Sequence, residues 1–82
     1  MTNKQLKELK SLFRRLNEKN KCHNRKYVCR VDKFAYNAYC MDVEFTLMFS
    51  TDHEEIMRYV LKNHLLCTVS GRGNGIAYMD IQ

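Results

Sequence analysis

The sequence predicts an α+β fold in which two helices cover one face of a four-stranded antiparallel sheet. Three observations lead to this prediction. Apolar and polar side chains alternate along residues 39–49, which is the period of a strand. One segment before it and one after it carry apolar residues at spacings of three and four, which is typical of a helix with one buried face. Near the end of the chain, the glycine-rich segment 71–75 separates two short apolar stretches, as in a hairpin.

The first helix is predicted to begin at a cap formed by Thr2 or Asn3 and to end near Asn17. Basic side chains occupy most of its remaining surface. The helical period is lost over residues 18–25, which we expect to form a loop. The apolar stripe of this helix consists of Leu6, Leu9, Leu12, Phe13 and Leu16.

Residues 26–35 and 39–49 are predicted to form a hairpin with its turn at 36–38. The second strand has one fully apolar face, so we expect it in the centre of the sheet. The first strand carries charges on both faces, which is typical of an edge strand. An unpaired edge at residues 26–35 or 76–81 would also allow a homodimer by strand pairing.

A second helix is predicted to start within residues 50–52, where two capping boxes fit the sequence. One pairs Thr51 with Glu54, and the other pairs Asp52 with Glu55. Strands at 65–70 and 76–81 follow, joined by the turn at 71–75. The predicted order is therefore α-β-β-α-β-β, with both helices on one face of the sheet.

A chain of 82 residues is short enough to form a single domain over residues 1–82. Its N-terminus is polar and no apolar run approaches the roughly 20 residues that span a bilayer, so we expect a cytoplasmic protein without a membrane partner. In a reducing compartment its four cysteines are expected to remain free thiols.

The residues able to bind zinc or act as nucleophiles are spaced too loosely to predict a metal site, a cofactor or an enzyme. Only His64 and Cys67 have the two-residue separation that zinc sites favour. Asp42 and Glu44 share one strand face, where exposed carboxylates more often serve solubility than acid–base catalysis. A role beyond packing stays open for four residues: Cys22, His23, His64 and Cys67.

Positive charge is concentrated in the first part of the chain. Residues 1–33 hold eleven Lys and Arg against three acidic residues, whereas residues 34–82 hold three against six. A continuous cationic segment predicts contact with nucleic acid or a nucleoprotein through the first helix and its loop. Tyr27, Tyr36 and Tyr39 lie nearby and are candidates for stacking on unpaired bases. The predicted contact residues are Lys7, Lys10, Arg14, Arg15, Lys19, Lys21, Arg25, Lys26, Arg30 and Arg72.

The alternative hypothesis is a protein that docks on a host protein through charged surfaces. Its predicted contacts are the acidic residues Asp42, Glu44, Glu54 and Glu55. The composition is rich in Lys, Asn, Met and Tyr and lacks Pro and Trp. In this respect it resembles small phage or mobile-element proteins that inhibit a host factor.

Overall fold

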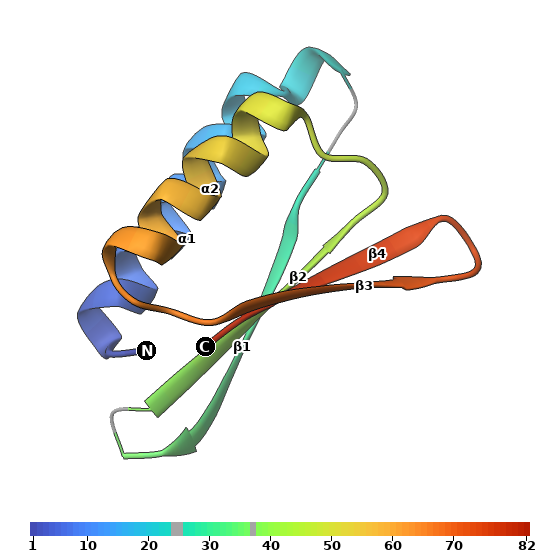
Figure 1. Cartoon of the computed structure of the whole chain (residues 1–82). Coiled ribbons are helices and arrows are strands. Elements are labelled where there is room, and N and C mark those ends of the chain that lie inside the picture. The colour runs from blue at the N-terminus through green and yellow to red at the C-terminus, as the bar shows by residue number, and fades with distance from the viewer. Residues whose placement is uncertain (24–25, 37) are drawn as a thin grey trace.

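Two helices lie on one side of a four-stranded antiparallel sheet, and the β3–β4 hairpin extends beyond them (Figure 1). The computed structural model describes residues 1–23, 26–36 and 38–82, with the side chain of Arg72 outside this description. Both the fold class and the α-β-β-α-β-β order agree with the prediction. The elements are α1 (Asn3–Lys19), a short 3-10 helix η1 (Lys21–His23), β1 (Val28–Ala35), β2 (Ala38–Phe45), α2 (Ser50–Lys62), β3 (Cys67–Arg72) and β4 (Ile76–Ile81).

Helix α1 begins at a capping box formed by Thr2 and Gln5. The Gln5 backbone N–H donates to Thr2 Oγ1 at 3.2 Å, and the Thr2 backbone N–H donates to Gln5 Oε1 at 2.9 Å. The helix extends to Lys19, two residues beyond the predicted end. All five apolar residues of the predicted stripe are buried, so the helical period identified the inner face correctly.

The start of helix α2 differs from the prediction. Its N-cap is Phe49, which makes no side-chain capping hydrogen bond, so neither predicted capping box forms. Asp52 lies within the first turn and is fully buried. Its carboxylate turns into the core because three donors from other segments meet it there. No helix within the described residues is long and apolar enough to cross a membrane.

The strands are arranged in the order β1-β2-β4-β3. The prediction of a central strand from residue 39 is confirmed, because β2 pairs with β1 on one side and β4 on the other. The prediction that residues 76–81 form an edge is wrong. Met79 of β4 is opposite Val43 of β2 and Val69 of β3, so the second edge is β3.

Strand β2 ends at Phe45, four residues before the predicted end. Phe45 pairs with Ala77 and Glu44 pairs with Val28, which are near the ends of the neighbouring strands. Within the described residues, no paired position follows Phe45, and an alternating pattern alone cannot sustain a strand. Leu47 is consequently 54% exposed.

Other boundaries shift by two residues. Strand β1 begins at residue 28 instead of 26, and β3 spans residues 67–72 instead of 65–70. Gly75 adopts a φ of +83° in the β3–β4 turn, a conformation that favours glycine. Asn37, predicted to form the first hairpin turn, lies outside the described residues.

The buried carboxylate of Asp52 joins α2 to the end of α1 and to the start of β1. It accepts hydrogen bonds from Lys19 Nζ at 2.5 Å, Asn20 Nδ2 at 2.7 Å and Tyr27 Oη at 2.7 Å. Asn20 and Tyr27 are each only 2% exposed. A buried carboxylate is stable only when its oxygens are paired in this way, so these contacts fix how the three segments meet.

Asn17 strengthens the same junction. Its side chain accepts from the Tyr27 backbone N–H at 2.8 Å and donates to the Tyr27 carbonyl at 2.9 Å. The Asn17 amide thus satisfies both the N–H and the C=O of Tyr27, as the backbone of a neighbouring strand would. The C-terminal half of α1 is thereby fixed directly beside β1.

Burial raises the pKa of Asp52, but the hydrogen bonds from Lys19, Tyr27 and Asn20 together outweigh this effect and leave the pKa below its ordinary value of 3.8. The folded chain therefore holds this carboxylate ionised more strongly than the unfolded chain does. The resulting stability is present above the unfolded pKa and is lost as pH falls through the folded pKa.

Replacement of Asp52 by alanine is expected to lower the free energy of unfolding by about 2–5 kcal/mol, because Asn20 and Tyr27 would keep buried donors without their acceptor. Tyr27→Phe removes one donor and should lower it by about 1–2 kcal/mol. Urea denaturation measures both effects. Glu54→Ala, an exposed carboxylate on the same helix, is the matched control and should change stability by less than about 0.5 kcal/mol. A D52A variant as stable as this control would contradict the structural role.

The pH dependence of this junction can be isolated with Asp52→Asn. Asparagine does not titrate, so the stability advantage of the natural chain over D52N should shrink as pH falls from about 5 to about 2. Urea midpoints measured across this range give the difference directly. A difference that stays constant with pH would show that Asp52 has the same pKa in both states.

Candidate nucleic-acid interface

A groove of about 610 Å³ lies between α1 and β1 and is lined by four basic side chains. Lys10 and Arg14 come from α1, Lys21 from η1, and Lys26 from the segment leading into β1. All four are exposed, and Glu18 is the single acidic residue in the described lining. The groove therefore presents a net positive surface to solvent.

The walls of this groove are held by the core beneath them. Phe13, Tyr27 and Cys29 also line it, and Phe13 and Tyr27 are buried and meet edge to face with ring centroids 6.0 Å apart. Asn17 lines the groove and anchors the backbone of Tyr27. The four cations thus project from segments with fixed separation, which reduces the conformational entropy lost on binding an anion.

A second groove of about 740 Å³ lies between α1 and α2. It contains Lys7 and Arg15 of α1 together with two cations of α2, Arg58 and Lys62. Here the positive charge is partly compensated, because Arg15 pairs with Glu55 and a second carboxylate, Glu8, lines the groove and accepts from the Tyr59 hydroxyl at 3.1 Å. The pKa of Tyr59 is raised to about 12. Burial is the largest cause, and the hydrogen bond to Glu8 and the negative charge of Glu8 add to it.

The remaining predicted cations lie elsewhere. Lys19 pairs with Asp52, and Arg30 is opposite Asp42 in the β1–β2 ladder, on the face of the sheet away from the helices. Arg25 and the side chain of Arg72 lie outside the described part of the chain. The structure thus brings together Lys10, Arg14, Lys21 and Lys26, and it places Lys7, Arg15, Lys19 and Arg30 elsewhere.

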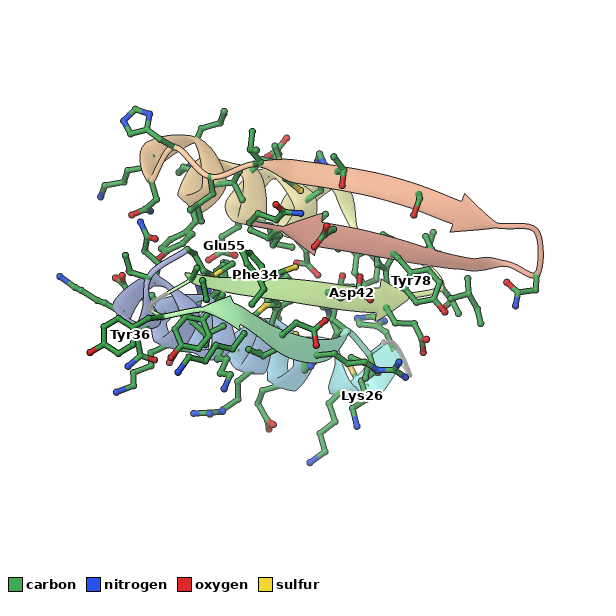
Figure 2. All side chains as sticks on the ribbon, turned by 90° about the horizontal axis from the view of Figure 1, so that it is seen from below. Lys26, Phe34, Tyr36, Asp42, Glu55 and Tyr78 are labelled. Atoms are coloured by element: carbon green, nitrogen blue, oxygen red, sulfur yellow. The ribbon has the colours of Figure 1, made fainter. Side chains whose placement is uncertain are left out.

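The three tyrosines considered for base stacking have different environments. Tyr27 is 2% exposed and donates its hydroxyl to Asp52, so its ring is part of the core and cannot stack on a base. Tyr39 is half-buried. Tyr36 is 88% exposed. It lies at one end of β1, and Lys26 lies at the other end (Figure 2).

The acidic residues of the alternative hypothesis do not share one surface. Asp42 and Glu44 lie on the outer face of the sheet, where Asp42 is opposite Asp80 and the Glu44 carboxylate accepts from Tyr78 Oη at 3.1 Å (Figure 2). Glu54 and Glu55 belong to α2, on the other side of the sheet. Two further carboxylates, Asp32 and Asp80, occupy the outer face as well.

The cysteines are free thiols in different environments. Cys29 is opposite Val43 and Cys40 is opposite Asp32, so the two thiols are not cross-strand neighbours. Burial raises the pKa of Cys29 to about 11, opposed by the charge of Lys10. Burial, the hydrogen bond from Cys40 Sγ to Asp80 at 2.7 Å and the surrounding carboxylates raise the pKa of Cys40 to about 12. Within residues 1–23, 26–36 and 38–82, no three His, Cys, Asp or Glu side chains are placed to hold a metal ion.

Sequence reasoning missed the cations that α2 contributes to the second groove. Arg58 and Lys62 fall within residues 34–82, whose net charge is negative, so a prediction based on net charge omitted them. Their separation of four residues places them on one helix face, and this signal was available from the sequence. The acidic outer face could also have been found, since Asp32 and Asp80 occupy the same alternating positions as Asp42 in their strands.

Comparisons with known proteins give no match. No family model, no curated protein and no solved structure matches the chain.

The thiol environments predict selective alkylation. At about pH 8, iodoacetamide should modify the exposed Cys22 first, because a raised pKa leaves little thiolate at Cys29, Cys40 and Cys67. Mass spectrometry of peptides at increasing times measures the order. In urea all four thiols should react at similar rates, which serves as the control. Modification of Cys40 as fast as Cys22 in the folded protein would contradict its environment in the structure.

Proposed function

We propose that the protein is a small non-catalytic binding protein that contacts nucleic acid through the groove between α1 and β1. The observation that carries the proposal is the convergence of Lys10, Arg14, Lys21 and Lys26 on one groove with a single carboxylate in its described lining. Flexible basic side chains that neutralise phosphates release condensed counterions, which supplies affinity for any sequence.

The distribution of charge over the two faces supports the same function. The outer face of the sheet carries Asp32, Asp42, Glu44 and Asp80, and Arg30 is the basic residue among the described side chains at the paired positions there. A phosphate backbone would be repelled from that face and attracted to the helix side. The bipolar charge therefore orients a polyanion toward the groove.

The arrangement also favours backbone contact over base reading. The basic side chains of the groove are three lysines and one arginine. Lysine binds phosphate as a point charge, whereas base recognition in duplex DNA relies on paired hydrogen bonds from groups such as the arginine guanidinium. We therefore expect weak dependence on base sequence and strong dependence on salt.

Neutralising three groove residues together, as K10Q/R14Q/K26Q, should weaken binding and flatten its salt dependence. Each lost phosphate contact should reduce the slope of log K against log salt by about 0.7–0.9, so the triple variant should lose about 2–3 in slope. Fluorescence anisotropy with a labelled oligonucleotide between about 50 and 200 mM salt measures this. The matched control is K7Q/R58Q/K62Q, which removes the same net charge from the second groove.

We expect the control variant to keep a slope within about 1 of the natural chain. Equal losses in both variants would show that overall charge, rather than this groove, determines binding. Absence of binding by the natural chain at about 50 mM salt would contradict the proposal. A partner protein retained from a nuclease-treated extract would instead favour the alternative of docking on a host protein.

A further inference from the structure

We infer that the nucleic acid bound in this groove is single-stranded and that Tyr36 stacks on one of its bases. This inference rests on the proposed function and adds the class of nucleic acid to it. Three features carry it: the exposure of the Tyr36 ring, a cation held against that ring, and the position of both at the end of the strand that forms one wall of the groove.

Tyr36 exposes a large aromatic ring that is not part of the hydrophobic core. It is 88% exposed, the highest value among the exposed large apolar and aromatic side chains of the described residues. Phe34, 63% exposed, lies over the outer face of the sheet and apart from Tyr36 (Figure 2), so it adds nothing to this site. Leaving the Tyr36 ring in water forgoes the stabilisation that burial would give, so this ring is available to a ligand.

Lys33 places a positive charge beside this ring. Its Nζ lies 5.9 Å from the centroid of Tyr36 and 5.8 Å from that of Tyr39, within the range of a cation–π contact. The Lys33 ammonium group would therefore lie near the phosphate of a nucleotide whose base stacks on Tyr36. A positive charge beside an aromatic platform is the combination that single-strand binding proteins use.

The backbone of β1 connects this end to the groove. Cys29 lines the groove, and Val31 and Lys33 follow it on the same face because alternate residues of a strand point the same way. The distance along the strand from Cys29 to Lys33 is about 13 Å, a span that a few nucleotides can cover. In Figure 2, Lys26 and Tyr36 mark the two ends of this path.

The N-terminus of α1 is fixed at the same end. The amino group of Met1 donates to the Tyr39 carbonyl at 2.9 Å, and the Tyr39 backbone N–H donates to the Met1 carbonyl at 3.0 Å. Helix α1 therefore runs along β1 from the Tyr36 end to the Lys26 end. A strand of nucleic acid lying between them would meet basic side chains along its backbone and an aromatic ring at one end.

A single strand fits this surface better than a duplex does. In a duplex each base is already stacked between its neighbours and paired with its complement, so an exposed tyrosine at a hairpin end has no free base face to contact. Unpaired bases all have such a face. Stacking therefore adds affinity for single strands of any sequence and leaves duplex binding to the phosphate contacts alone.

Tyr36→Ala tests the inference, with Tyr36→Phe as the matched control that keeps the ring. The probes are a labelled oligothymidine and a mixed-sequence duplex of the same length, and anisotropy titrations give both affinities. We expect Y36A to weaken binding of the single strand by about 5- to 150-fold, the range that loss of one stacked base corresponds to. Y36F should stay within about 3-fold of the natural chain, and duplex binding should be unaffected by either change.

The outcomes separate this inference from the proposed function. If Y36A binds oligothymidine as well as the natural chain does, while binding still falls steeply with salt, the stacking inference is wrong and the groove remains the proposed site. If Y36A weakens single strand and duplex equally, the inference is also wrong, since stacking would act on the single strand alone. If the natural chain binds neither probe at about 50 mM salt, both are wrong. Urea midpoints equal to that of the natural chain would verify that the variants fold, as the exposure of Tyr36 leads us to expect.

Discussion

The carboxylate of Asp52 is buried at the point where three segments of the chain meet. Lys19 and Asn20 reach it from the end of α1, Tyr27 from the residue before β1, and Asp52 itself belongs to α2. An ionised carboxylate in a protein interior is stable only when charge and hydrogen bonds replace the water it has lost. The relative positions of both helices and the first strand therefore depend on keeping this set of contacts complete.

The proposed binding groove follows from that junction. Lys21 comes shortly after the α1 residues that contact Asp52, and Lys26 directly precedes Tyr27. Their placement beside Lys10 and Arg14 thus depends on how the end of α1 and the start of β1 are joined. Repulsion among the four cations is opposed by this junction and by Glu18, so the core supports a surface that would otherwise disfavour the folded state.

The two faces of the molecule differ in charge. The helices cover the apolar face of the sheet and carry most of the positive charge, while the opposite face carries Asp32, Asp42, Glu44 and Asp80. The segregation arises because strand residues alternate between faces and the acidic ones occupy the same alternate positions. Alternation within the strands thus places these carboxylates on the outer face, and the basic residues of the helices lie on the other side of the sheet.

The fold class, the order of elements and the buried stripe of α1 could all be predicted from periodicity, because periodicity is a local property that survives into the folded state. The end of β2 and the identity of the second edge strand were decided by pairing between distant strands, which no local pattern contains. Asp52 looked like a helix cap because its neighbours fit a capping box, and only the tertiary structure brought Lys19, Asn20 and Tyr27 to it. Net charge predicted a basic surface, but which four cations share a groove depended on how α1 packs beside β1.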